Sequence, residues 1–210
     1  MRYVLMCGGL YSNFGKHKAL AEIHGEPLIE RTIRLLHEAG VDEYTITVTE
    51  GNHDFDYLGN VVPMKNSYIY ENGEIQGFWV DAFKDFGEPT CYICTDVYYM
   101  PETIKQIVDH STGKNTLFGA VNTDLKPWQE PLAYKVYDTK AFFEGIEIVK
   151  QAWRDGKCDR HPLIWELYRV LNGININDHR LFAETYVESR NGDMDIDVPE
   201  DIEKLEKYYG

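Results

Sequence analysis

A glycine-rich segment with two lysines near the N-terminus has the composition needed to bind phosphate groups. Residues 6–18 read MCGGLYSNFGKHK and continue directly from an apolar run at residues 3–6. Glycines let backbone N–H groups approach phosphate oxygens closely, and Lys16 and Lys18 add positive charge to an otherwise acidic chain. The carboxyl end of a strand is also where α/β proteins bind ligands. We therefore expect this segment to bind a nucleoside triphosphate, although a tight surface turn with solvated lysines has the same composition.

Carboxylates at two distant positions could hold a divalent cation beside such phosphates. Asp96 follows the apolar run at residues 91–94, and residues 193–201 read DMDIDVPED, which includes Asp195 and Asp197. Mg²⁺ prefers hard oxygen ligands, and alternating aspartates repel one another unless they share a cation. Asp96, Asp195 and Asp197 are therefore candidates to hold a divalent cation such as Mg²⁺. As alternatives, Asp96 could be a turn or helix-cap residue, and Asp197 and Asp201 could favour the N-terminus of the last helix.

Polar residues in the second half of the chain could contact a second substrate. Arg160 and His161 come just before Pro162, where a helix is expected to begin, and Trp165 follows one turn later. Two cations at a positive helix end are unfavourable unless an anion joins them, although exposed cations there are often simply solvated. A second candidate pair, Glu130 and Lys135, flanks the apolar run at residues 132–136. We expect these five residues to bind a small phosphorylated or acidic acceptor.

The elements that position these residues alternate between short apolar runs and amphipathic patterns. This alternation predicts an α/β fold with a mainly parallel sheet and helices on both faces. We expect strands at residues 3–6, 44–48, 67–70, 91–94, 116–121, 132–136 and 186–187, and helices at residues 27–39, 78–83, 141–153 and 162–171 and beginning at Pro101 and Pro199. The whole chain, 1–210, is expected to be one domain, with a nucleotide-binding half at 1–121 and an acceptor-binding half with the closing segment at 122–210.

Composition narrows the classes of partner. The formal net charge of −14 argues against nucleic acid and anionic membranes as partners, and no apolar run is long enough to span a bilayer. Cys91 and Cys94 have CxxC spacing, but in a strand residues three apart point to opposite faces, so we expect core packing. With no export signal and four cysteines expected to be reduced, we expect a cytoplasmic protein. A homodimer is left open.

Residues 6–33 resemble the opening of the sugar-nucleotide pyrophosphorylase and cytidylyltransferase superfamily, and residues 193–201 resemble its closing DIDTPED segment. This resemblance implies a three-layer, Rossmann-like fold of the glycosyltransferase-A type. It also implies Mg²⁺-dependent transfer of a nucleoside monophosphate from a triphosphate to a small acceptor, with release of pyrophosphate. The C-terminal segment favours CMP as the transferred group.

The resemblance assigns roles to individual positions. Lys18 corresponds to the signature lysine that contacts phosphates, Asp96 and Asp197 to metal ligands, and Gly77 to a glycine near the nucleobase. Nucleotide contacts are implied for the loop residues Cys7, Gly8, Gly9, Leu10, Tyr11 and Asn13.

Three positions depart from the family pattern. Tyr11 replaces its second glycine, Asn13 its arginine and His17 the proline before the lysine. Because the arginine stabilises triphosphate charge, Lys16 or a distant arginine must replace it, or else the chain binds nucleotides without transferring them. A glycosyltransferase that uses sugar nucleotides is the other alternative, although the Asp-x-Asp typical of such enzymes is Asp96-Val97-Tyr98 here.

Overall fold

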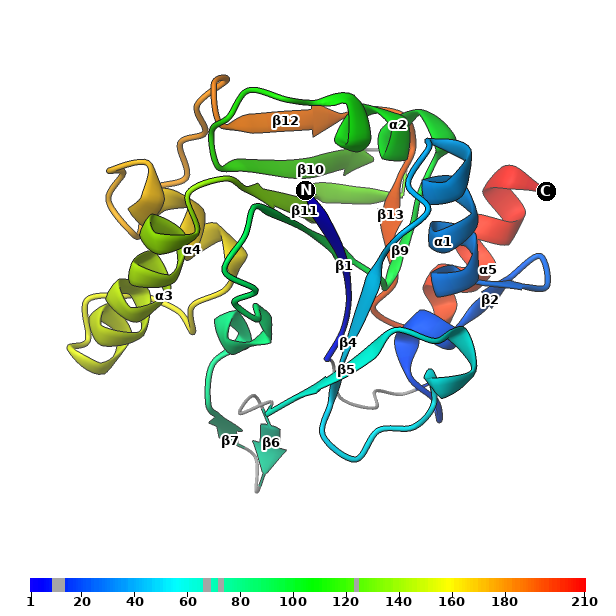
Figure 1. Ribbon diagram of the computed structural model, residues 1–210, viewed down its shortest axis with the longest axis horizontal. Helices are drawn as coiled ribbons and strands as arrows, with labels where there is room; N and C mark the ends of the chain where they lie inside the picture. The colour runs from blue at the N-terminus through cyan, green and yellow to red at the C-terminus, as the bar shows by residue number, and fades with distance from the viewer. Residues whose placement is uncertain (9–13, 66–68, 72–73, 123–124) are drawn as a thin grey trace.

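The computed structural model describes residues 1–8, 14–65, 69–71, 74–122 and 125–210. Within these residues a seven-stranded sheet has the order β12-β10-β11-β8-β1-β4-β5 (Figure 1). β1 pairs in parallel with β4 and β8, β4 with β5, and β10 with β12, whereas β11 is antiparallel to both of its neighbours. The strands are β1 (Arg2–Cys7), β4 (Thr45–Thr49), β5 (Val61–Met64), β8 (Thr90–Cys94), β10 (Thr116–Asn122), β11 (Lys126–Val136) and β12 (Tyr186–Ser189).

Helices cover both faces of this sheet, which confirms the predicted three-layer α/β fold. In Figure 1, α1 (Leu28–Glu38) and α2 (Pro101–Asp109) lie on one side, and α3 (Thr139–Arg154) and α4 (Ile164–Leu171) lie on the other. Each side has its own buried cluster: Leu5, Ile93 and Ile104 belong to the first, and Tyr92, Phe142 and Leu167 to the second. The C-terminal helix α5 (Pro199–Tyr209) packs against a third, smaller cluster that includes Leu28, Tyr98 and Leu205.

Shorter elements complete the fold at the ends of the strands. Three 3-10 helices are described, η1 (Lys18–Leu20), η2 (Asp56–Leu58) and η3 (Trp79–Ala82). The short strand pairs are β2 (Glu22–Ile23) with β3 (Glu26–Pro27), β6 (Ile69–Glu71) with β7 (Glu74–Gln76), and β9 (Val97–Tyr98) with β13 (Met194–Asp195).

Most predicted elements are confirmed, and the differences have local causes. α1 ends before Gly40, whose φ of +86° is a left-handed conformation that glycine adopts without strain. α4 begins at Ile164, two residues later than predicted, because the Glu166 carboxylate accepts a hydrogen bond from Leu163 N at 2.9 Å and so caps the helix there. Residues 78–83 form only the 3-10 helix η3, and β11 starts six residues before the predicted strand. Of the strand expected at residues 67–70, the described part lies in β6.

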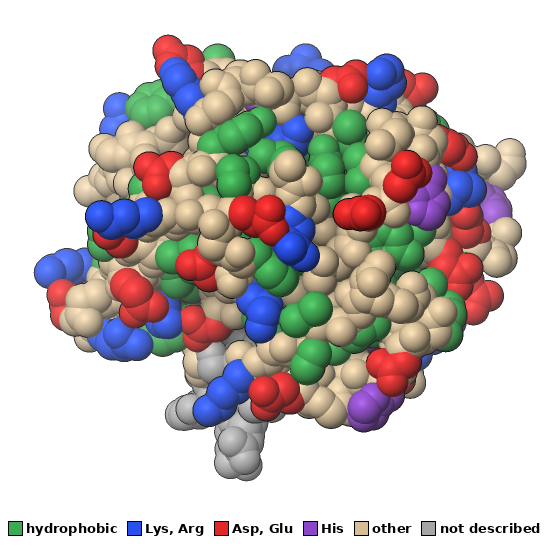
Figure 2. Space-filling view, in the orientation of Figure 1, with side chains coloured by type: hydrophobic (Ala, Val, Ile, Leu, Met, Phe, Trp, Pro, Cys, Tyr) green, Lys and Arg blue, Asp and Glu red, His purple; other side chains and the backbone are tan. Residues whose placement is uncertain are grey.

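Charged side chains of both signs are interspersed on the face of the molecule shown in Figure 2. Several acidic groups pair with nearby cations, for example Lys105 with Asp109 and Arg34 with Glu26 and Glu38. On the described residues of this face, lysine and arginine do not form a continuous basic surface of the kind that binds a polyanion.

Candidate active site

The pairing of β9 with β13 brings the two predicted carboxylate segments together. Asp195 is the register partner of Val97, and Ile196 N donates a 2.8 Å hydrogen bond to the carbonyl of Asp96. Asp96 itself lies at the bend where β8 ends. Residues about 100 positions apart in sequence are therefore fixed to one another by backbone hydrogen bonds at the carboxyl edge of the sheet.

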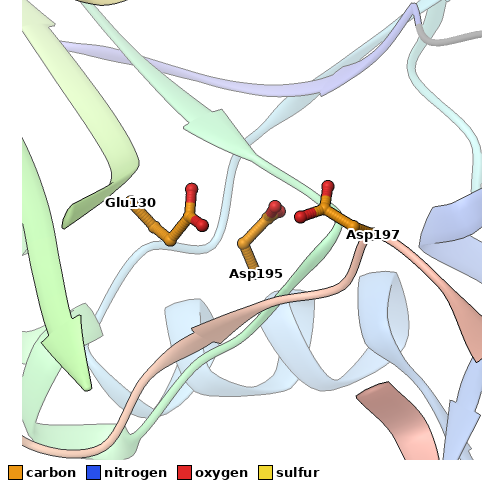
Figure 3. Close-up of side chains that lie close together, drawn as sticks. All are labelled: Glu130, Asp195 and Asp197. Carbon is orange, nitrogen blue, oxygen red and sulfur yellow. The ribbon is translucent and has the colours of Figure 1, made fainter. Parts of the chain in front are cut away.

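Three carboxylates converge at this edge. Glu130, Asp195 and Asp197 each offer an oxygen atom, and these oxygens all lie within 4.8 Å of one another (Figure 3). Burial, with the negative charges of Asp96, Asp197 and Glu130, raises the pKa of the Asp195 carboxyl well above its ordinary value. Such mutual repulsion disfavours the charged form unless a cation joins the group.

A β-bulge in β11 turns Glu130 toward this cluster. Phe118 pairs with Ala133 whereas Gly119 pairs with Pro131, so Leu132 is the extra residue. Leu132 and Ala133 both point into the cluster of buried residues beneath α1 and α2. Side chains in a regular strand alternate, so Glu130 would share the face of Tyr134, which packs on the α3 side. The extra residue reverses this alternation, so Glu130 lies on the opposite face from Tyr134, toward the carboxylate cluster.

Lys18 lies among the same carboxylates. Its Nζ is 3.3 Å from Asp197 Oδ1 and 3.7 Å from Asp96 Oδ2, and its side chain is 22% exposed. Burial alone would lower the pKa of Lys18, but the charges of Asp96, Asp195 and Asp197 raise it above its ordinary value. Lys18 is therefore a cation at neutral pH.

His17, which replaces the family proline before Lys18, fixes the backbone that carries this lysine. His17 is 4% exposed, has φ −61° and caps η1 by accepting a hydrogen bond from Ala19 N through Nδ1 at 3.2 Å. Its ring also packs edge-on against Phe55. Because proline fixes φ near −65°, His17 gives the backbone the conformation that the family proline would give.

Two further aspartates of the C-terminal segment have structural contacts. Asp201 is 2% exposed and accepts hydrogen bonds from Asp197 N at 3.0 Å and Val198 N at 3.2 Å. Asp193 is 1% exposed and accepts from Met100 N at 2.8 Å and Thr103 Oγ1 at 2.7 Å at the start of α2. The helix-capping alternative therefore applies to Asp201, and it leaves Asp195 and Asp197 for the cluster.

The rest of the predicted phosphate segment is described only in part. The Cys7 thiol lies 3.3 Å from the Thr95 hydroxyl, and burial raises its pKa to about 12. The carbonyl of Gly8 accepts a 3.1 Å hydrogen bond from Thr49 Oγ1. Lys16 pairs with Glu22 at 3.0 Å. The predicted nucleotide contacts at Gly9, Leu10, Tyr11 and Asn13 lie outside the described residues.

The structure does not bring the predicted acceptor residues together. Lys135 is 2% exposed, and its ammonium donates to the carbonyls of Val108 at 2.9 Å and His110 at 2.6 Å, at the C-terminus of α2. Its register partner is Cys91, near the start of β8, whereas Glu130 belongs to the carboxylate cluster beyond the end of β8. Our expectation that Glu130 and Lys135 act as a pair is therefore corrected.

The other three acceptor candidates lie near α4. Arg160 Nε donates to the buried Glu166 carboxylate at 2.8 Å, which supplies the anion that this helix start requires. His161 Nε2 lies 2.9 Å from the carbonyl oxygen of Gly77. The Trp165 ring packs against the Tyr186 ring, with 6.1 Å between the ring centroids. Gly77, which is expected near the nucleobase, is thus in contact with His161, which is expected near the acceptor.

Comparison with known proteins identifies the family of the chain. Residues 3–160 match the MobA-like NTP transferase domain. The chain belongs to this family. It is 35% identical over 63 residues to the choline-phosphate cytidylyltransferase of Haemophilus influenzae, a match that spans 28% of this chain and only 27% of that protein. The matched family is one of nucleotidyltransferases, as the two end segments implied.

Solved structures show the same fold over the whole chain. The CTP:phosphocholine cytidylyltransferase of Streptococcus pneumoniae superposes with a TM-score of 0.63 at 17% identity, over 100% of this chain and 99% of the other. The inositol-1-phosphate CTP transferase of T. maritima gives 0.63 at 13% identity, over 98% and 93%. In the described part of the chain, no helix is both long enough and apolar enough to cross a bilayer.

Proposed function

We propose that this chain transfers CMP from CTP to a small phosphorylated acceptor and releases pyrophosphate. The observation that carries the proposal is the convergence of Lys18, Asp96 and Asp197, from three distant parts of the chain, at the carboxyl edge of the sheet. The named relatives act on choline phosphate and inositol 1-phosphate and use a cytidine nucleotide, which supports CTP as donor and a phosphate as acceptor.

The donor set fits Mg²⁺. Asp96, Asp195, Asp197 and Glu130 supply only carboxylate oxygens, which are the ligands that this ion prefers. We propose that these carboxylates hold the ion. When bound, Mg²⁺ supplies charge stabilisation to the phosphate oxygens.

The reaction requires positioning and charge rather than a nucleophile from the protein. An oxygen of the acceptor phosphate forms a bond to the α-phosphorus of CTP as the bond to the bridging oxygen breaks, and pyrophosphate leaves with that electron pair. Lys18 is the cation placed to bind the phosphates. The neighbouring Cys7 is not a nucleophile here, because burial keeps its thiol protonated.

The acceptor is proposed to bind between the cluster and the start of α4. Arg160 and His161 retain this role as a proposal because the contact of His161 with Gly77 brings the α4 side next to the nucleotide side. The Arg160 side chain is 49% exposed, so part of it remains open to an anion.

The test is release of pyrophosphate with each of the four nucleoside triphosphates, Mg²⁺, and choline phosphate or inositol 1-phosphate as acceptor. We expect turnover with CTP and, in Asp96→Asn and Asp197→Asn, a loss of at least a hundredfold, since each variant removes a charged ligand. Tight CTP binding without pyrophosphate release would indicate a nucleotide-binding module. Release of a nucleoside diphosphate from sugar nucleotides would indicate a glycosyltransferase.

A further inference from the structure

Lys18 contacts acidic side chains, although its proposed role is to bind phosphate. Its ammonium lies between the carboxylates of Asp96 and Asp197, within 3.7 Å and 3.3 Å, and these are the two side chains proposed to bind the metal. By contrast, the ammonium of Lys16, two residues earlier, pairs with Glu22 outside this cluster.

We propose that Lys18 is an internal counter-cation of the metal site, which it holds assembled until a divalent cation displaces it. The inference rests on the proposed function, because it takes Asp96 and Asp197 as the metal ligands. It adds that the metal and the lysine compete for the same two carboxylates and that metal entry frees Lys18 to bind phosphate.

Electrostatics supports this exchange. The carboxylates of Asp195, Asp197 and Glu130 meet in a partly buried position, the charge of Asp96 acts on Asp195, and Lys18 is a cation that the structure places against Asp96 and Asp197. Removal of its charge would increase the repulsion between the carboxylates of Asp96 and Asp197. An ammonium and a divalent cation repel each other strongly at this range, so both cannot occupy the space between the same two oxygens.

The backbone around Lys18 allows the side chain to move while its origin stays fixed. Ala19 is fully buried and His17 nearly so, and the His17 ring caps η1 and packs on Phe55. The Lys18 stem therefore leaves a rigid base, and only its flexible four-carbon chain has to rotate to exchange aspartate for phosphate.

The test is a titration of Mn²⁺ binding without nucleotide, in which the electron paramagnetic resonance signal measures the free ion. We expect Lys18→Met to bind Mn²⁺ about tenfold more tightly than the wild type, because the competing charge is gone. Lys18→Arg keeps the charge and should bind like the wild type. Lys16→Met is the matched control and should also be unchanged, because its partner is Glu22.

The thermal midpoint gives an independent readout. Without metal, Lys18→Met should melt below the wild type, and Mn²⁺ should raise its midpoint by more than it raises that of the wild type. Mn²⁺ affinity in Lys18→Met that is equal to or weaker than the wild type overturns this inference. If Asp197→Asn still abolishes Mn²⁺ binding in that case, the proposed metal site stands. If Asp197→Asn binds Mn²⁺ like the wild type, the metal assignment within the proposed function fails as well.

Discussion

At the scale of single residues, Glu130 shows how the role of a side chain depends on which face it occupies. Its residue type and its place beside an apolar run predict contact with an acceptor, but its carboxylate lies with those of Asp195 and Asp197. One oxygen of each carboxylate lies within 4.8 Å of the others, which is near the limit of about 4.2 Å for two oxygens that share one Mg²⁺ at about 2.1 Å each. The geometry thus favours a contribution of Glu130 to the cation site.

Replacing Glu130 by glutamine tests this assignment, because the change keeps the shape of the side chain and removes its charge. We expect Mn²⁺ affinity to fall on the order of tenfold, while the KM for the acceptor changes little. Glu188→Gln is the control: this acidic residue of β12 pairs with Arg190 at 2.6 Å and lies outside the cluster. Unchanged Mn²⁺ affinity with a raised acceptor KM would return Glu130 to the acceptor site.

At the scale of elements, the site depends on the junction between β13 and α5. The backbone N–H groups of Asp197 and Val198 both donate to the buried Asp201 carboxylate, which also pairs with Lys204 at 2.9 Å. An acid in the first turn of a helix stabilises its positive end, and here it also fixes the backbone that carries Asp197. The cap and the proposed metal ligand Asp197 are therefore mechanically connected.

Asp201→Ala should lower the free energy of unfolding by about 1–2 kcal/mol and weaken Mn²⁺ binding, because the N–H groups of Asp197 and Val198 then lose the oxygen that accepts both of their hydrogen bonds. Unfolding by urea and Mn²⁺ titration measure the two effects. Glu200→Gln removes one exposed charge from the same turn and should change either quantity much less. Equal effects of the two substitutions would show that only the helix dipole, and not the cap, matters.

Long amphipathic elements and buried strands were predictable because their periodicity is carried by many residues. The starts of α2 and α5 at Pro101 and Pro199 follow from proline chemistry alone. β9 and β13, by contrast, have two residues each and no period to detect, and they form only because each pairs with the other. The bulge at Leu132 was also missed, since one extra residue in a strand leaves no pattern beyond the nearby Pro131.

At the scale of the whole molecule, the sheet runs through both predicted halves of the chain, and the site forms where its central strands end. The strand-end rule placed Asp96 and the phosphate segment at one edge from sequence, and the family resemblance added Asp197. The sequence did not reveal orientation, namely which face Glu130 occupies and that the Lys18 ammonium lies against aspartates. Both depend on contacts between segments that are far apart in the chain.

Lys135 of β11 contacts the end of α2 and is buried, so its substitution should change the free energy of unfolding of the whole protein. Its ammonium donates to two carbonyls at the end of α2, Val108 and His110. Lys135→Met leaves both carbonyls without this donor and should cost roughly 2 kcal/mol of unfolding free energy at pH 7. Lys140→Met, at an exposed position of α3, is the control and should cost almost nothing.

The dependence of this cost on pH distinguishes a buried charge from simple loss of packing. Burial lowers the pKa of Lys135 below its ordinary value, which is near 10.4 in the unfolded chain. At pH values between the lowered pKa of folded Lys135 and its ordinary pKa in the unfolded chain, the unfolded state binds more protons than the folded state. The free energy of unfolding of the wild type therefore rises with pH in this range, as the buried charge is lost. Tyrosine and cysteine titrations are shared with Lys135→Met and largely cancel in the difference. Urea unfolding from pH 7 to pH 10 should therefore show the advantage of the wild type over Lys135→Met growing toward pH 10, whereas a constant difference would mean that Lys135 carries no penalty for its buried charge.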